Sequence, residues 1–284
     1  MIIRPVTLTR KQVSPLLKPR PRDSHKGMFG TVVVIGGATG MAGAPLLAAR
    51  AALKMGAGCV HAGLLAQGAP VADMVQPELM LHGTQEALDI EADVYAIGCG
   101  LGQSREAQML VYEVLQRKVP VVLDADALNL IASDPALQDD VHKRKAATVL
   151  TPHPGEAAKL LGCTTAEIQA DRASAIQMLA RKFECSVVLK GADSLCATSG
   201  GKLFINKTGN PGMSSAGMGD VLTGMVAAFI AQGLGADDAM LLAVHLHGAA
   251  GDALAERGIT IGMTASDVTE WARWLLNQMG PKTK

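Results

Sequence analysis

TVVVIGG, at residues 31–37, consists of five β-branched residues followed by two glycines. An apolar run of this length that ends on glycine predicts a β-strand buried on both faces, as in a parallel sheet. Comparable runs recur along the chain, and most end at glycine or at a polar turn. The strands expected from them span residues 31–37, 59–65, 93–100, 119–126, 147–153 and 186–191.

Longer patterns with helical spacing separate these runs. The alternation predicts an α/β fold with a central, mostly parallel sheet and helices on both faces. Residues 194–206 differ, because two extended runs flank Gly200 and Gly201 and indicate a hairpin. Asp237 and Ser266 are the expected N-caps of the last two helices. The helices are expected at 44–55, 104–117, 155–161, 166–184, 218–233, 237–256 and 266–278.

The composition argues against several classes of protein. The 284 residues carry no net formal charge and only 3% are aromatic, whereas nucleic-acid binders usually have a basic surface and often stacking aromatics. The most apolar stretches, 221–236 and 239–250, contain glycine, threonine or histidine and indicate buried helices rather than membrane spans. The five cysteines form no C-x-x-C pair and the N-terminus has no secretory signal, so we expect a cytoplasmic protein with free thiols.

We expect a single domain with a short extension. Residues 1–24 are expected to form an N-terminal arm, and residues 25–279 the domain itself. In doubly wound sheets, ligands bind beyond the carboxyl ends of the strands. Most glycine clusters here follow strands, so we expect them at that edge, where the backbone approaches a ligand closely.

The stretch NPGMSSAGMGD, residues 210–220, places glycines and a single carboxylate directly before a long apolar helix. Such a turn points backbone N–H groups at one spot, and the helix dipole adds to their attraction for a phosphate. Asp220 has two interpretations on spacing alone. It is either a helix residue favoured by the dipole or a general base that takes a proton from an attacking hydroxyl.

Three other stretches also carry candidate chemistry with open alternatives. In VVLKGADS, residues 187–194, Lys190 either grips a nucleotide or is a solvated lysine at a strand exit. In LTPHPGE, residues 150–156, two prolines hold His153 stiffly, which suits either a functional or a structural histidine. In DADALN, the carboxylates of Asp124 and Asp126 suit magnesium-water or phosphate chemistry, or helix capping.

Six stretches, in this order, resemble the ADP-dependent NAD(P)H-hydrate dehydratases, a ribokinase-like family of repair enzymes. They are HKGMFGTVVVIGGATGMAGA, GCGLGQS, DADALNL, LTPHPGE, VVLKGADS and TGNPGMSSAGMGDVLTG, and they cover about residues 25–275. One departure is small: relatives usually have alanine, threonine and glycine before GMGD, where this chain has SSA.

The resemblance implies a lyase that restores hydrated NADH or NADPH and consumes ADP. In this reaction the ring hydroxyl is phosphorylated and the phosphate then leaves. The resemblance further implies Mg²⁺, for which Asp124 and Glu156 are candidate ligands. It also implies a homo-oligomer, a tetramer, and a separate NAD(P)H-hydrate epimerase as functional partner, with no nucleic acid or membrane involved.

The resemblance also assigns roles to individual residues. It makes Asp220 the catalytic base, while Asn210 is expected to tether the loop or the phosphate. The substrate-binding residues are Ala44, Gly102, His153 and Asp220. The nucleotide-binding residues are Lys190, Gly191, Ala192, Asp193, Ser194 and Gly219, and the anion hole is Ala216, Gly217, Met218 and Gly219.

Two other functions compete with this interpretation. A small-molecule kinase of the same fold, acting on a thiazole or a pyrimidine, also places an acid after a glycine-rich turn. A non-catalytic nucleotide sensor would bind tightly without turnover and would be indifferent to Asp220→Asn.

Overall fold

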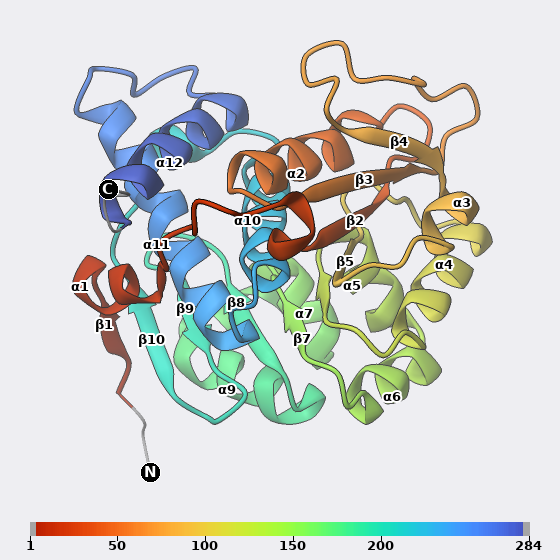
Figure 1. Ribbon diagram of the computed structural model, residues 1–284. Coiled ribbons are helices and arrows are strands. Elements are labelled where there is room, and N and C mark those ends of the chain that lie inside the picture. The colour runs from red at the N-terminus through yellow and green to blue at the C-terminus, as the bar shows by residue number, and fades with distance from the viewer. Residues whose placement is uncertain (1–3, 281–284) are drawn as a thin grey trace.

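The computed structural model describes residues 4–280 and places a ten-stranded sheet at the centre of the molecule (Figure 1). The strand order is β1-β10-β9-β8-β7-β6-β5-β2-β3-β4, and only β9 runs antiparallel to its neighbours. The strands are β1 (Val6–Leu8), β2 (Thr31–Gly36), β3 (Cys59–Leu64), β4 (Met80–Gly83), β5 (Val94–Ile97), β6 (Val121–Leu123), β7 (Thr148–Leu150), β8 (Ser186–Leu189), β9 (Leu195–Ala197) and β10 (Leu203–Asn206).

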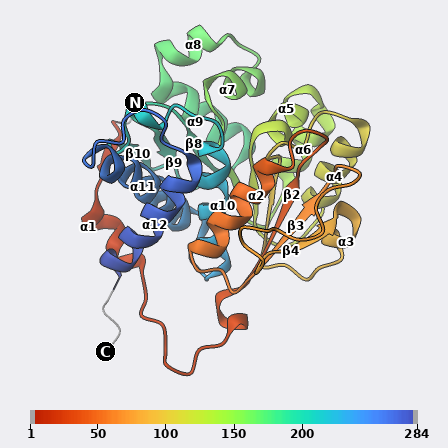
Figure 2. The same ribbon diagram turned by 90° about the horizontal axis from the view of Figure 1, so that it is seen from above.

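Helices cover both faces of the sheet, as the sequence predicts, and each face has its own apolar core (Figure 2). One core holds α2 (Gly43–Lys54), α10 (Met218–Ala231), α11 (Ala236–Ala255) and α12 (Ala265–Met279). The other holds α3 (Thr84–Leu88), α4 (Arg105–Leu115), α5 (Ala125–Ser133), α6 (Pro135–Lys143), α7 (Pro154–Leu161), α8 (Thr165–Ala170) and α9 (Arg172–Phe183).

The tightest helix crossing joins α2 and α10. A β-carbon placed on Gly224 would lie 1.9 Å from the carbonyl oxygen of Ala48, so only glycine fits at this point. Because both helices begin at the carboxyl edge of the sheet, this crossing fixes their N-terminal ends relative to each other.

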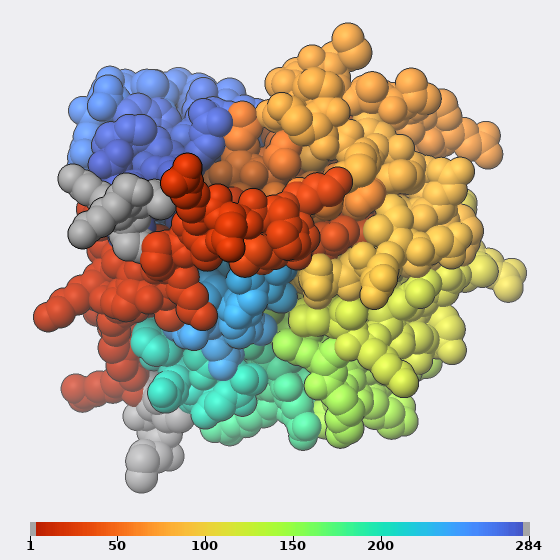
Figure 3. All heavy atoms as spheres, viewed as in Figure 1, coloured from red at the N-terminus to blue at the C-terminus, as the bar shows by residue number. Residues whose placement is uncertain are grey.

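The segment before β2 crosses the surface of the molecule (Figure 3). Its described part contributes β1, which pairs in parallel with β10 at the sheet edge, and the short helix α1 (Arg10–Val13). The sequence predicts an extended arm or an edge helix in this segment. It does not predict β1, because the pattern of three residues is too weak to indicate a strand. The first three residues of the expected arm lie outside the described residues.

Three local expectations are wrong. The helix expected over 166–184 is two helices, because Asp171 leaves helical geometry and its carboxylate caps α9 by accepting from the N–H of Ser174. Asp237 does not cap α11; its carboxylate accepts instead from Ser186 and Ser199. Thr264 rather than Ser266 caps α12.

The sequence interpretation also missed β4 and the helices α3, α5 and α6. Helices α5 and α6 begin at the capping residues Asp124 and Asp134. None of the helices between residues 4 and 280 combines the length and the apolar character needed to cross a bilayer.

Candidate active site

The candidate site lies at the N-terminal end of α10, where Gly217 adopts a positive φ of 88° and turns the chain into the helix. A β-carbon on Gly219 would lie 3.1 Å from Nζ of Lys190 and 3.5 Å from Oδ2 of Asp124. The first turn of α10 therefore presents free N–H groups and a neighbouring ammonium at one place. This is the arrangement that binds a phosphate.

A buried carboxylate holds that ammonium in position. Oδ1 of Asp124 lies 2.6 Å from Nζ of Lys190, and Oδ2 accepts a hydrogen bond of 2.7 Å from the hydroxyl of Thr223. Glu156 lies on the other side of the ammonium, with 3.9 Å between Oε2 and Nζ. Burial acts to lower the pKa of Lys190, but Asp124 and Glu156 more than offset it, so the ammonium keeps its proton.

Asp220 is half-buried beside this cluster, with its carboxylate near the last glycine of the loop: a β-carbon on Gly217 would lie 3.9 Å from Oδ2. Burial raises the pKa of Asp220 to about 6, and the Asp124 carboxylate adds to the rise. A hydrogen bond from the Cys99 thiol and the charge of Lys190 act in the opposite direction. A carboxyl group tuned in this way is a base near neutral pH.

The two glycine-rich turns after β2 and β5 lie against each other next to Asp220. The N–H of Ala38 donates to the carbonyl of Gly100, and a β-carbon on Gly100 would lie 3.1 Å from Cβ of Ala44. The N–H of Gly102 donates to Oδ2 of Asp126 over 2.8 Å. Cys99, whose thiol hydrogen-bonds to Asp220, lies in the second turn, so the turns that lead to Ala44 and Gly102 border Asp220 although they come from distant parts of the sequence.

His153 caps helix α7 with its own imidazole. Nδ1 accepts from the N–H groups of Gly155 and Glu156, while Nε2 lies 3.1 Å from Oε1 of Glu156. Both ring nitrogens therefore have partners within one helical turn, while the side chain as a whole is more than half exposed. Contact with a substrate would then use the face of the ring and not a hydrogen bond.

The expected nucleotide loop follows β8, and α9 holds it in place. Arg172 donates to the carbonyls of Leu189 and Lys190 and also to that of Ala192. The loop contains Gly191 at a φ of 134° and Asp193 at 54°, and the hydroxyl of Ser194 closes it onto the carbonyl of Gly191. Arg172 is a site residue that the sequence interpretation missed, since nothing marks an arginine at a helix start as the anchor of a later loop.

Asn210 tethers its own loop. Its amide nitrogen donates to Asp252 and its amide oxygen accepts from the N–H of Gly212. Asn210 was expected to tether either the loop or the phosphate, and the structure shows that it tethers the loop.

The described residues do not form a ready-made metal site. Across residues 4–280, no three His, Cys, Asp or Glu side chains are grouped so that they could hold a metal ion. The oxygens of both candidate ligands are already hydrogen-bonded: those of Asp124 to Lys190 and Thr223, and those of Glu156 to His153. A Mg²⁺ ion at this site would have to take most of its ligands from nucleotide and water.

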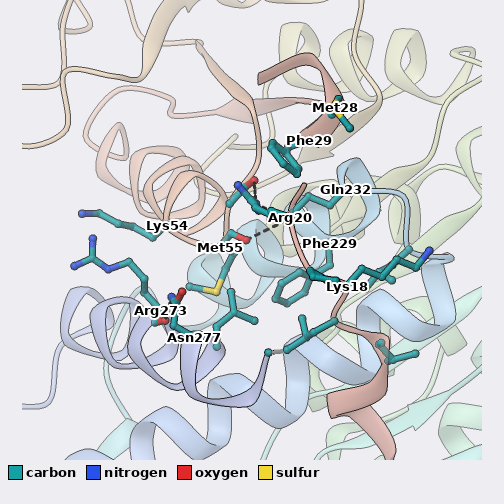
Figure 4. A pocket seen from close by; sticks show the side chains of 17 residues that line it. Lys18, Arg20, Met28, Phe29, Lys54, Met55, Phe229, Gln232, Arg273 and Asn277 are labelled. Carbon is teal, nitrogen blue, oxygen red and sulfur yellow. Dashed lines mark hydrogen bonds between the residues drawn. The ribbon is translucent and has the colours of Figure 1, made fainter. Parts of the chain in front are cut away.

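A large cavity of about 550 Å³ lies elsewhere, between the N-terminal segment and the C-terminal ends of α2, α10 and α12 (Figure 4). Two of its cations lie at the C-terminal end of α2: Arg20 donates to the carbonyl of Gly56 just beyond the helix, and Lys54 is its last residue and pairs with Glu270, as Arg273 also does. Cations are favourable at helix C-termini. The cavity lies at the far ends of α2 and α10 from Ala44 and Asp220, so it is not part of the candidate site.

Comparison with known proteins decides the family. The family described as NAD(P)H-hydrate dehydratase matches residues 32–273 of this chain. The chain belongs to the NAD(P)H-hydrate dehydratase family. This confirms the resemblance carried by the six sequence stretches and accounts for the ribokinase-like fold.

Individual members of the NAD(P)H-hydrate dehydratase family resemble the chain over most of its length. It is 43% identical to the ADP-dependent (S)-NAD(P)H-hydrate dehydratase of Neisseria meningitidis, covering 93% of this chain and 90% of that one. It is 42% identical to the bifunctional NAD(P)H-hydrate repair enzyme Nnr of Coxiella burnetii, but spans only 54% of that protein. The crystal structure of the ADP/ATP-dependent dehydratase of Bacillus subtilis, co-crystallized with ATP and Mg²⁺, superposes with a TM-score of 0.88 at 31% identity, covering 97% of this chain and 99% of that one.

Proposed function

We propose that the protein dehydrates hydrated NADH and NADPH to the intact reduced cofactor, with ADP as co-substrate. The observation that carries the proposal is the half-buried Asp220, with its pKa raised to about 6, next to the Lys190 ammonium and the glycine-lined end of α10. Base, cation and N–H donors meet at one point, which is what transfer of a phosphoryl group to a hydroxyl requires.

The proposed reaction has two stages. Asp220 takes the proton of the ring hydroxyl, whose oxygen attacks the terminal phosphorus of ADP, and AMP leaves. The phosphate ester then breaks at its carbon–oxygen bond as the ring nitrogen donates its electron pair. Loss of a proton from the neighbouring ring carbon restores the double bond and leaves inorganic phosphate. Phosphate leaves readily where hydroxide would not, which explains why a nucleotide is consumed.

Each group in the site has a part in the first stage. The N–H groups of Ala216, Gly217, Met218 and Gly219, with the Lys190 ammonium, stabilise the negative charge that spreads over the phosphoryl oxygens. The loop from Lys190 to Ser194 holds the nucleotide, while Ala44, Gly102 and His153 contact the dinucleotide. Mg²⁺ bound to the nucleotide phosphates would neutralise part of their charge.

The test is incubation with chemically hydrated NADH, Mg²⁺ and either ADP or ATP. We expect recovery of absorbance at the reduced-nicotinamide band, with one inorganic phosphate and one AMP released per NADH when ADP is used. A stable phosphate ester without recovered absorbance would instead identify a small-molecule kinase. Tight nucleotide binding without turnover would identify a sensor.

We further propose that residues 25–279 form one catalytic domain and that the protein is a cytoplasmic homotetramer. An NAD(P)H-hydrate epimerase would be its functional partner, because the related repair enzyme of Coxiella burnetii is bifunctional. Sedimentation of the purified protein tests the tetramer. Stimulation of turnover on mixed epimers by an added epimerase tests the partnership.

A further inference from the structure

The loop that leads into the phosphate-binding turn lies along helix α11, which packs on one face of the sheet (Figure 1). Two glycines of α11 make this approach possible. A β-carbon on Gly248 would lie 2.3 Å from the hydroxyl oxygen of Thr208, and one on Gly251 would lie 2.2 Å from the sulfur of Met213. Helix α11 therefore presents a flat surface on which residues 208–213 rest.

Asp252, on the same helix, binds this loop through both carboxylate oxygens. Oδ2 accepts from the N–H of Gly209 over 2.9 Å, and Oδ1 accepts from the amide nitrogen of Asn210 over 3.0 Å. Asn210 in turn binds the next part of the loop, because its amide oxygen accepts from the N–H of Gly212 over 3.0 Å. A chain of three hydrogen bonds thus runs from α11 to the turn that precedes the anion hole.

The loop has few other anchors before it enters α10. The hydroxyl of Thr208 donates to the carbonyl of His245, and the hydroxyl of Ser215 donates to the carbonyl of Met263. Between these two points the described hydrogen bonds that leave the loop are those to Asp252. The carboxylate of Asp252 is therefore placed to fix where the N–H groups of residues 216–219 point.

We propose that Asp252 is a positioning residue of the reaction: it holds residues 209–212, and through them the anion hole and Asp220, in the geometry that phosphoryl transfer needs. The kinetic part of this inference rests on the proposed function. A substitution can shift catalytic groups by about 1 Å without touching them, and such a shift can lower the reaction rate on the order of 100-fold.

The test uses an exchange of the two side chains. In Asp252→Asn two amide nitrogens face each other when the introduced amide oxygen accepts from Gly209, and in Asn210→Asp two carboxylates face each other. Each single variant therefore loses the hydrogen bond between the two side chains, while the bond from the N–H of Gly209 can remain. In the double variant, the amide introduced at position 252 can accept from Gly209 and donate to the carboxylate introduced at position 210. That carboxylate still accepts from Gly212, so all three hydrogen bonds and the net charge are restored.

We expect each single variant to lower kcat by about 10- to 100-fold with little change in the KM for hydrated NADH, and the double variant to recover most of kcat. Asp237→Asn is the matched control, because Asp237 lies on the same helix about 22 Å away and also accepts from a backbone N–H and from hydroxyls. That variant should keep the wild-type kcat.

Hydrogen exchange of the amides of residues 209–219 gives a readout that needs no turnover. Exchange there should accelerate in both single variants and return to the wild-type rate in the double variant. Unchanged kcat and exchange in the single variants, or a double variant no better than either, would overturn the role of Asp252. If the wild-type protein fails to turn over hydrated NADH, the proposed function fails and the exchange rates alone decide the role of Asp252.

Discussion

The ammonium of Lys190 lies 2.6 Å from a carboxylate oxygen of Asp124, and both groups border Gly219 at the entrance to α10. Asp124 is almost fully buried, with a side chain that is 1% exposed, whereas the Lys190 side chain is 19% exposed. The carboxylate thus has no access to solvent and serves to place a positive charge where a phosphate would bind.

Replacing Lys190 with alanine should affect both binding and stability. We expect the apparent KM for ADP to rise more than the KM for the dinucleotide, since the ammonium faces the expected phosphate site. The variant should also lose about 3 kcal/mol in free energy of unfolding, because it leaves a buried carboxylate unpaired. Steady-state kinetics and urea unfolding measure the two effects. Lys207→Ala, which removes an exposed ion pair to Asp193, is the control and should change stability little. A larger rise in the KM for the dinucleotide would mean that the two subsites are interchanged.

Asp220→Asn should abolish most turnover while leaving ADP affinity nearly unchanged. Loss of a general base costs about 10²- to 10⁴-fold in rate, and the N–H groups and Lys190 that hold the phosphates remain in place. Single-turnover kinetics with hydrated NADH and calorimetric titration with ADP separate the two effects. Near-normal activity in this variant would exclude Asp220 as the base.

The rate should depend on pH through Asp220. The base acts when it is deprotonated, and its pKa is raised to about 6, so kcat should rise as the pH increases through 6 and then level off. The Cys99 thiol lowers this pKa by hydrogen bonding, so Cys99→Ala should move the rise to higher pH. The shift is measured from kcat of the wild-type protein and of Cys99→Ala at on the order of nine pH values between pH 5 and pH 9. A profile that moves to lower pH in Cys99→Ala would contradict the contact.

The raised pKa of Asp220 also affects stability, but stability should fall with rising pH where the rate should increase. A carboxyl group whose pKa is higher in the folded state than in the unfolded state favours folding below its unfolded pKa and loses that contribution as the pH rises through 6. Asp220→Asn should therefore raise the melting temperature at pH 8 and leave it nearly unchanged at pH 4. Thermal unfolding at the two pH values is the measurement, and an equal shift at both would exclude the titration of Asp220 as its cause.

Gly224→Ala should destabilise the crossing of α2 and α10. The added methyl group would lie 1.9 Å from the backbone oxygen of Ala48, and overpacking against backbone costs about 3 kcal/mol. Gly200→Ala is the control, because a β-carbon on Gly200 meets nothing within 4 Å. Denaturant unfolding of both variants should show a large loss for the first and little for the second.

Much of this fold follows from the sequence because local pattern and burial agree. Strands such as β2 and β5 are buried on both faces, so their apolar runs are continuous and easily recognised. The same reasoning places Asp220 at a helix entrance, because glycine and a following apolar run mark that point. Strand β4 was missed because it lies at the sheet edge, where its four residues are at least partly exposed and show no buried pattern.

The partners of the site residues are what the sequence does not show. Asp124 was expected to be a candidate metal ligand. In the structure it caps α5 and also pairs with Lys190, 66 positions later. Arg172 and Asp252 anchor the two loops of the site from helices that carry no recognisable motif. Hydrogen bonds of this kind depend on how distant segments meet, and residue type alone does not specify that meeting.

The position of β1 bears on the order in which the protein matures on the ribosome. Its residue Val6 aligns with Phe204 of β10, so β1 is synthesised well before the strand with which it pairs. Until β10 has been synthesised, the backbone N–H and C=O groups of β1 that pair with it can hydrogen-bond only to water. Pairings between such remote segments form slowly. The edge strand can therefore join the sheet only after β10 has been made, although it is translated earlier.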